Sequence, residues 1–247
     1  MSAEPPKLYL LDVEGTIAPL SLTTEVLFPY ARRHFALFLE RHRNDPAVHE
    51  DLASLEAENR LEAANGVPRL PPIASPADTA HPRFRLDAMM YLMWLMDRDR
   101  KSTALKSLQG KIWKQGFESG ELKGTLFDDV PDALRRWSAA GRVAIYSSGS
   151  VEAQKLFFRY SSHGDLSPLI AAYFDTRTGP KIQPSSYAAI ASAMSLPPPH
   201  VLFFSDSVPE LDAARQEGCQ TRLVLRPGNP LSTDPHAHSP VESFALL

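Results

Sequence analysis

Side chains that could carry out phosphoryl transfer occur at four places where apolar runs end or loops follow. They are Asp12 and Glu14, Ser147 and Ser148, Lys181, and Asp206. Carboxylates that face one point repel one another unless a cation lies among them, and hard oxygen ligands favour Mg²⁺. In this interpretation Asp12 attacks phosphorus to form an aspartyl phosphate. Mg²⁺ and Lys181 offset the charge on the transferred oxygens, and the serine hydroxyls donate to the anion.

The pattern of apolar residues places these side chains at the ends of strands. Strands are expected at residues 8–11, 143–146, 172–174, 201–204 and 221–225, with helices at 130–140, 151–158, 187–194 and 209–217. Alternation of strands and helices predicts an α/β fold with a doubly wound parallel sheet. Ligands bind such sheets at the carboxyl ends of the strands, so we expect the four places to meet at one edge.

The segment between the first strand and the others has a different pattern. It predicts helices only, at residues 25–41, 51–64, 85–98 and about 105–117, with a loop at 65–82 that contains five prolines. The helix at 85–98 is apolar nearly all round and is expected to be buried. We therefore predict a helical cap domain at residues 20–123, inserted into an α/β core made of residues 1–19 and 124–247.

The tail and the overall composition add further expectations. Residues from Arg226 onward are rich in Pro, Ser and His and are expected to be irregular, with His236 and His238 exposed rather than paired on a metal. The net charge of −3, with no block of Lys or Arg, gives no reason to expect nucleic acid as a partner. The single cysteine fits a reducing compartment, and neither a signal peptide nor a membrane span is apparent. We expect a cytoplasmic monomer.

Four short stretches resemble the motifs of the haloacid-dehalogenase-type phosphohydrolases. They are Asp12–Thr16, Tyr146–Ser150, Lys181 and Ser205–Asp206. Longer stretches resemble, more narrowly, the enolase-phosphatases of methionine salvage. These are LFPYARR (27–33), LKSLQGKIWKQGF (105–117), YSSGSVEAQKLFF (146–158), YFDTRTGPK (173–181) and VLRPGN (224–229).

The resemblance implies a bifunctional hydrolase of phosphoric monoesters. Its substrate would be 2,3-diketo-5-methylthiopentyl-1-phosphate, enolised and then dephosphorylated to the acireductone 1,2-dihydroxy-3-keto-5-methylthiopentene. The same resemblance assigns three groups of residues. Catalysis would involve Asp12, Glu14 and Lys181; one Mg²⁺ per subunit would be bound by Asp12, Glu14 and Asp206; and the substrate would contact Ser147, Ser148 and Lys181.

Two questions stay open at this point. The base for enolisation is either Glu14 or a residue of the cap, and Glu14 stands where the wider superfamily commonly has Asp as a general acid. Three alternatives also remain: another phosphatase of the superfamily with a cap but no enolase step, a phosphosugar mutase, and a binding module without activity.

Overall fold

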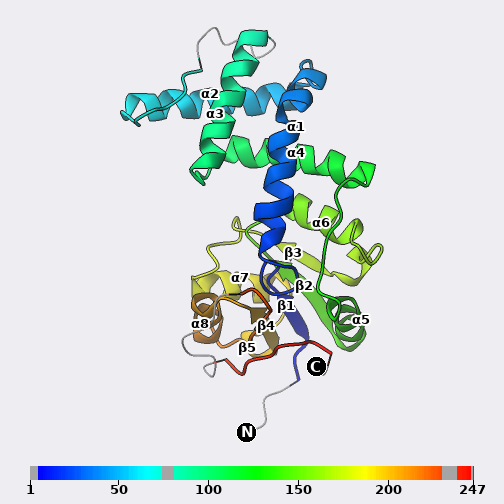
Figure 1. Ribbon diagram of the computed structural model, residues 1–247. Helices are drawn as coiled ribbons and strands as arrows, with labels where there is room; N and C mark the ends of the chain where they lie inside the picture. Colours follow the sequence, from blue (N-terminus) through cyan, green and yellow to red (C-terminus); the bar gives the residue numbers. More distant parts are fainter. Residues whose placement is uncertain (1–4, 74–80, 230–237, 246) are drawn as a thin grey trace. The chain divides into compact units, whose positions relative to one another are not determined.

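The computed structural model describes residues 5–73, 81–229, 238–245 and 247, and its chain divides into two compact units (Figure 1). Unit 1 comprises Met1–Thr24 and Phe117–Leu247, and unit 2 comprises Glu25–Gly116. None of the helices in the described part of the chain has both the length and the apolar character needed to cross a membrane. The domain boundaries given above, after residues 19 and 123, stay a prediction.

Unit 1 is built on a five-stranded parallel sheet, which confirms the predicted fold class. Its strands are β1 (Leu8–Leu11), β2 (Arg142–Tyr146), β3 (Ala172–Phe174), β4 (Val201–Ser205) and β5 (Gln220–Leu223), in the order β3-β2-β1-β4-β5. Leu11 pairs with Ile145 on one side and with Phe204 on the other. The residues that follow β1, β2 and β4 therefore leave the sheet at one edge.

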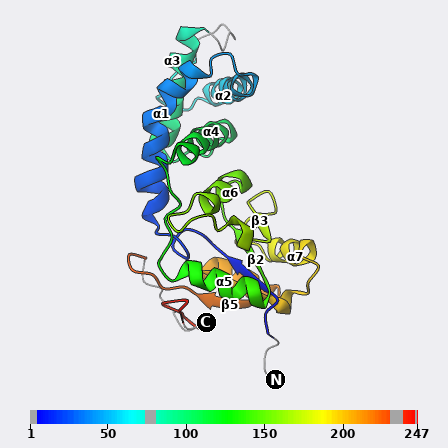
Figure 2. The same cartoon turned by 90° about the vertical axis from the view of Figure 1, so that its right-hand side faces the viewer.

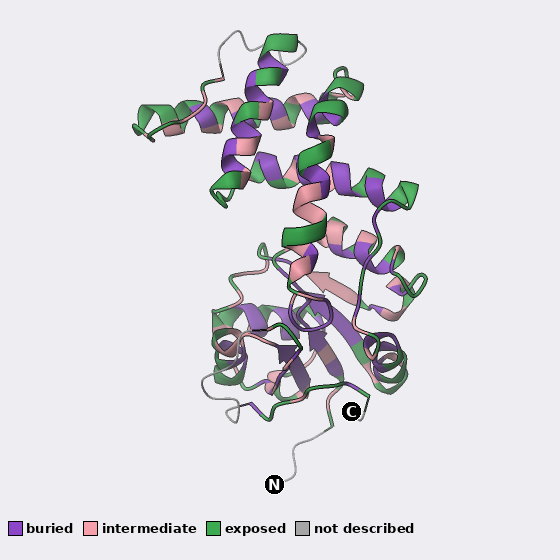
Figure 3. Ribbon diagram, in the orientation of Figure 1, coloured by how far each residue is buried: buried purple, intermediate pink, exposed green. Residues whose placement is uncertain are grey.

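Successive side chains of β1 point to opposite faces of the sheet, and both faces are covered. On one face, Leu8 and Leu10 pack in a buried cluster with residues of α7 (Pro184–Ala193) and α8 (Val208–Gln216). On the other face, Tyr9 stacks on Trp137 of α5 (Val130–Ala140) at 5.2 Å between ring centroids. Figure 3 shows the strands buried between these helices, and Figure 2 shows the same layers from the side.

Gly141 is the C-cap of α5, where its N–H donates to the carbonyl of Trp137 at 2.9 Å, and it also makes room for the start of the first strand. Its φ of −167° is extended backbone, not the left-handed conformation that glycine usually supplies at the end of a helix. A Cβ added at this position would lie 2.9 Å from the carbonyl oxygen of Lys7. The close approach of the first strand therefore explains the glycine.

The helices of unit 2 are α1 (Phe28–Arg41), α2 (Pro46–Ala64), α3 (Pro82–Asp97) and α4 (Thr103–Ser119), whose last residues belong to unit 1. The last three start two to five residues earlier than their apolar patterns indicate, whereas α1 starts later. Two of them begin at a proline preceded by a capping side chain: Asp45 accepts from the N–H of Ala47, and His81 from the N–H of Arg83. These polar first turns lack the apolar periodicity on which the prediction relied.

Two further expectations about the helical segment were wrong. The segment Leu22–Leu27 before α1 is a π-helical turn, where an α-helix from residue 25 was expected. Pro29 explains this, because it has no N–H to donate to the carbonyl of Glu25. Helix α3 also has an exposed face, since Leu86 and Met90 are 46% and 52% exposed.

The described part of the C-terminal segment packs on the rest of unit 1. His238 was expected to be exposed, and it is buried there instead. This histidine is 2% exposed and contacts the Thr221 hydroxyl at 2.9 Å and the Asp212 carboxylate at 3.2 Å. Phe244 is fully buried and packs edge-on against Trp137 and Phe204. His236 lies outside the described residues.

Asp129 holds this segment in place. Its Oδ2 accepts from the Phe244 N–H at 2.7 Å, the Ser243 hydroxyl at 2.8 Å and Nη1 of Arg226 at 2.9 Å. Burial raises the pKa of Asp129, but these three hydrogen bonds outweigh burial and hold the pKa below the ordinary value of 3.8. The stabilisation is therefore present above pH 3.8 and is lost as the pH falls through the lower pKa of the folded protein.

Replacing Asp129 by asparagine should destabilise the protein by about 1–3 kcal/mol near neutral pH, because donors are left with a poorer acceptor. The difference in Tm from wild type should shrink between about pH 6 and about pH 3, where the wild-type carboxylate is itself being protonated. Thermal unfolding at both pH values measures this. The control is Asp132→Asn in the same helix, because the Asp132 side chain is 74% exposed. A difference for Asp129→Asn that stays constant with pH would contradict the prediction.

Candidate active site

All six residues singled out above line one cavity of about 210 Å³ in unit 1. The lining consists of Asp12, Glu14, Leu20, Ser147, Ser148, Lys181, Asp206 and Glu210. These residues come from the ends of β1, β2 and β4, from the loop before α7 and from the first turn of α8. Glu210 and Leu20 were not among the assigned site residues.

Asp12 is held rigidly at the end of β1. Its main-chain N–H donates to the carbonyl of Phe204 at 3.0 Å, which continues the pairing with β4. The residue is 7% exposed, and its Oδ1 accepts from the N–H of Val13 at 2.7 Å. The hydroxyl of Ser205 lies 3.4 Å from Oδ2. Because the strand and these donors fix the carboxylate, its orientation does not depend on a ligand.

Lys181 lies between two carboxylates. Its Nζ is 2.6 Å from Oδ1 of Asp12 and 2.6 Å from Oε2 of Glu210. Burial lowers the pKa of Lys181, but Asp12 and Glu210 outweigh burial, so the pKa lies above its usual value. The side chain is therefore a cation throughout the neutral range, next to the carboxylate that would attack phosphorus.

Three side-chain hydroxyls position the main chain around Lys181. Tyr146 donates to the carbonyl of Gly179 at 2.8 Å, Ser186 to that of Pro180 at 2.7 Å, and Tyr187 to that of Lys181 itself at 2.7 Å. All three donors are buried. The residues around Lys181 form neither a helix nor a strand. These side-chain hydrogen bonds therefore hold the main chain in place, as backbone hydrogen bonds do in a helix or strand.

The other carboxylates of the cavity have raised pKa values. Burial, together with the charge of Asp12, raises the pKa of Glu14 to about 7, although Lys181 lowers it. Burial also raises the pKa of Asp206 to about 7, with Asp12 and Glu210 adding to the effect and Lys181 opposing it. The pKa of Glu210 is raised by burial first and by Asp12 second. The single positive charge of Lys181 therefore does not offset the burial and mutual repulsion of the carboxylates in this cavity.

The donor chemistry of the cavity fits a divalent cation. Its carboxylates are hard oxygen ligands, and burial first and the charge of Asp12 second disfavour the ionised forms of Glu14 and Asp206, an effect that a bound cation would oppose. Within the described ranges, no three carboxylate, imidazole or thiol groups already surround a common point as metal ligands would.

Glu14 also contacts the π-helical turn that follows its loop, since it accepts a hydrogen bond from the hydroxyl of Thr23. The loop turns tightly before that point, because the N–H groups of Thr16, Ile17 and Ala18 all donate to the carbonyl of Val13. The longer side chain of glutamate thus reaches across the turn while it lines the cavity.

The two serines follow β2 and differ in exposure. Ser147 is 8% exposed, and its Oγ accepts from the N–H of Gly149 at 3.2 Å, whereas Ser148 is exposed. The next serine, Ser150, caps α6 (Val151–Arg159) by accepting from Ala153 at 3.3 Å. Capping by Ser150 leaves the hydroxyls of Ser147 and Ser148 on the cavity side.

Glu210 lies in the first turn of α8, where an acidic side chain can complement the helix dipole. It forms an ion pair with Lys181, and the hydroxyl of Ser205 lies 3.1 Å from its Oε2, so it is also a direct partner of the site lysine. The signal in the sequence was its spacing of four residues from Asp206, because one helical turn brings it back to the same edge.

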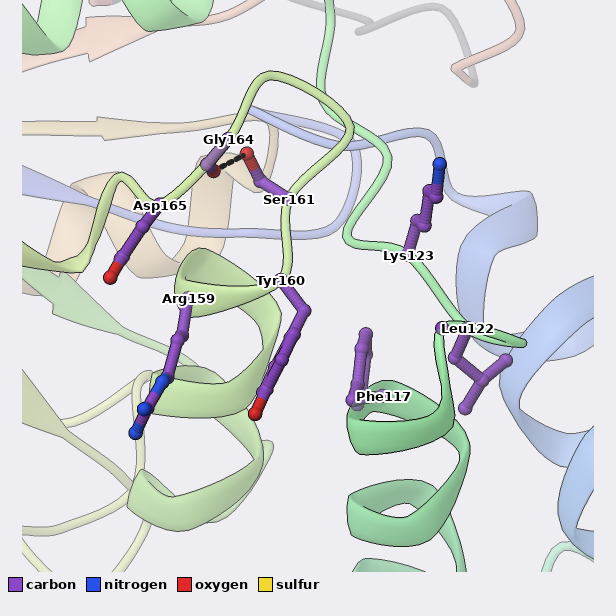
Figure 4. Close-up of a pocket in the computed structure, with 9 residues that line it drawn as sticks. Phe117, Leu122, Lys123, Arg159, Tyr160, Ser161, Gly164 and Asp165 are labelled. Carbon is purple, nitrogen blue, oxygen red and sulfur yellow. Dashed lines mark hydrogen bonds between the residues drawn. The ribbon is translucent and has the colours of Figure 1, made fainter.

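A second hollow of about 210 Å³ in unit 1 lacks this chemistry (Figure 4). Phe117 and Tyr160 stack at 6.3 Å within it, and the hydroxyl of Ser161 donates to the carbonyl of Gly164. The side chains of Lys123 and Arg159 extend away from each other. No converging set of charged groups makes this hollow a second candidate.

Comparison with known proteins places the chain in a family. The haloacid dehalogenase-like hydrolases match residues 6–218. A protein named enolase-phosphatase E1 from Synechococcus elongatus is 54% identical over 221 residues, which cover 89% of each chain. Another of that name, from Pseudomonas aeruginosa, is 44% identical over 97% of this chain and 96% of its own.

A solved structure agrees with these matches. The UTR4 protein of Saccharomyces cerevisiae is 32% identical, with a TM-score of 0.77 over 98% of this chain and 100% of that one. The chain belongs to the haloacid dehalogenase-like hydrolases and, within them, to the enolase-phosphatase E1 family.

Proposed function

We propose that the protein enolises 2,3-diketo-5-methylthiopentyl-1-phosphate and then removes its phosphate, to give the acireductone 1,2-dihydroxy-3-keto-5-methylthiopentene. The observation that carries this proposal is the position of Asp12, whose Oδ1 lies 2.6 Å from the Lys181 ammonium in a cavity lined by further carboxylates and serines. The names of the relatives supply the reaction class.

In the phosphatase step, a carboxylate oxygen of Asp12 attacks phosphorus, and the bond from phosphorus to the substrate oxygen breaks. The leaving group is an enolate, whose negative charge is delocalised, so it needs a strong general acid less than an alkoxide does. Water then attacks the phosphoryl group, releases inorganic phosphate and restores the Asp12 carboxylate. Lys181 offsets the charge of the transferred oxygens, and Ser147 and Ser148 donate hydrogen bonds to them.

Asp12, Glu14 and Asp206 would hold one Mg²⁺ per subunit. When bound, this ion supplies positive charge that neutralises the phosphoryl oxygens and aligns them for in-line displacement. The raised pKa values of Glu14 and Asp206 support this assignment, because a cation would favour their ionised forms.

Glu14 is also a candidate for proton transfer during enolisation. With no cation bound, its pKa of about 7 suits a general acid or base that works near neutral pH. A residue of the cap, predicted at 20–123, is the alternative. We further propose a cytoplasmic monomer without a nucleic-acid or membrane partner, in keeping with the net charge of −3 and the single cysteine.

The decisive experiment incubates the protein with the diketone phosphate and Mg²⁺ and follows enol absorbance and inorganic phosphate together. We expect the enol to appear first and phosphate release to follow, with phosphate release lost when a chelator removes the metal. Phosphate release from simple esters without an enol product from the diketone phosphate would contradict the enolase assignment. It would favour a phosphatase of the same superfamily without enolase activity.

A further inference from the structure

Asn229 connects the loop that follows β1 with the side chain of Asp206. It lies in the loop after β5, and its Nδ2 donates to the carbonyl of Gly15 at 2.7 Å and to Oδ2 of Asp206 at 3.3 Å. A primary amide has two N–H donors, so this geometry uses both of them. Asn229 does not line the cavity, so it can influence the site only through its two hydrogen-bond acceptors, Gly15 and Asp206.

The turn that presents Asn229 is anchored at its base by Arg226. The N–H of Asn229 donates to the carbonyl of Arg226 at 3.1 Å, and Gly228 between them has a φ of +88°. The buried guanidinium of Arg226 donates from Nε to the carbonyl of Thr16 at 3.0 Å, and it lies 4.5 Å from the ring of Phe127. The loop after β5 is therefore tied to the loop after β1 at two adjacent positions, Gly15 and Thr16.

The acceptors of Asn229 are packed closely against each other. Gly15 has a φ of +73°, and a Cβ added there would lie 2.2 Å from Oδ2 of Asp206 and 3.1 Å from Nδ2 of Asn229. The N–H of Asp206 also donates to the hydroxyl of Thr16 at 3.1 Å. Glycine is thus required for the carboxylate to come this near to the main chain, and Asp206 has little freedom to turn.

The chemical type of the donor is informative. Lys181 contacts Asp12 and Glu210, and a cation next to a carboxylate offsets its charge. An amide orients a carboxylate oxygen without neutralising it, so the negative charge of Asp206 stays available to a metal ion. Outer partners of this kind hold metal-ligating side chains in place in many proteins.

We propose that Asn229 is a positioning residue that sets the affinity of this site for Mg²⁺ by orienting Asp206 and the loop at Gly15. The inference rests on the proposed function, because it takes Asp206 to be a metal ligand. It adds a residue from the loop after β5 to a site whose other members come from β1, β2, β4, α8 and the loop before α7.

The test measures Mg²⁺ binding to the full-length protein by calorimetry, without substrate, and the rise in Tm that Mg²⁺ produces. Asn229→Ala removes the amide, and Asn229→Leu removes its donors while keeping a side chain of similar size. We expect both variants to raise the Kd for Mg²⁺ by about tenfold, the usual effect of losing an outer partner of a ligand. The rise in Tm with Mg²⁺ should shrink in parallel.

Asn59→Ala is the matched control, because Asn59 is 4% exposed and its amide also makes two main-chain bonds, to Pro71 at 2.9 Å and Ile73 at 3.1 Å. This variant should lower Tm without changing the Kd for Mg²⁺. A Kd within twofold of wild type in both Asn229 variants would overturn the inference and leave the proposed function intact. Failure of the wild-type protein to bind Mg²⁺ would overturn both.

Discussion

Asp12→Asn should abolish phosphate release, with a loss of at least about 10⁴-fold, while enolisation of the diketone phosphate continues. Asparagine has nearly the same shape as aspartate, but its neutral amide cannot displace the leaving group from phosphorus. Enolisation transfers a proton and needs no nucleophile at this position. The two activities should therefore separate, which enol absorbance and phosphate measurements on the same sample detect.

The matched control for this variant is Asp51→Asn. Asp51 also pairs with a lysine, Lys111, and accepts from the hydroxyl of Ser107 at 3.0 Å, but all three residues belong to unit 2. This control should retain both activities. Equal loss of both activities in Asp12→Asn, with Tm and Mg²⁺ affinity intact, would contradict the assignment of Asp12 to the phosphatase step alone.

Lys181→Met should lower phosphate release by about 10²–10³-fold, the usual effect of removing one charge-stabilising group from a transition state. It should also destabilise the fold by about 3–5 kcal/mol at most, since Asp12 and Glu210 lose their shared counter-ion in a poorly solvated site. Steady-state phosphate release and thermal unfolding measure the two effects. Lys181→Arg keeps the positive charge, so it should recover more of the stability than of the activity.

The pH dependence of this stability effect follows from the raised pKa of Lys181. Protonated Lys181 stabilises the folded protein fully at pH values below its pKa in the unfolded chain, near 10.5. This stabilisation is lost only as the pH rises through the higher pKa of Lys181 in the folded protein. The ammonium itself therefore makes no pH-dependent contribution to the Tm difference in the neutral range.

Lys111→Met is the matched control, because Lys111 pairs with Asp51 and its side chain is 32% exposed. Its loss should cost no more than about 1 kcal/mol, as for other partly exposed pairs. If Lys181→Met releases phosphate within tenfold of the wild-type rate, Lys181 does not stabilise the transferred phosphoryl group. If both lysine variants unfold at the same temperature, the ion pairs of Lys181 contribute little to the fold.

Much of unit 1 could be predicted because its signals are local. Short apolar runs that end in polar loops mark buried parallel strands, and β1 and β3 have the expected bounds while the other strands differ by one or two residues. Parallel strands bring their carboxyl ends to one edge, which explains why residues as distant as Asp12 and Asp206 line one cavity. Their catalytic and metal-binding roles stay predictions.

The error at His238 depends on contacts between residues distant in the sequence, whereas the π-helical turn before α1 follows from the nearby Pro29. His238 looked like part of an irregular tail, but it is buried because Thr221 and Asp212 supply partners for both ring nitrogens. The close approach of Lys7 to Gly141 is likewise a contact that only the folded chain shows. No periodicity within the tail or within α5 contains this information.

The sequence by itself determined the parallel α/β fold, the strand ends that carry Asp12 and Asp206, and the resemblance to enolase-phosphatases, because these depend on residue order and local pattern. Only the tertiary structure decided that Lys181 bridges Asp12 and Glu210, and that Asn229 joins Gly15 to Asp206. Hydrogen bonds and ion pairs require distances of about 3–4 Å, and only the folded chain brings such distant residues so close.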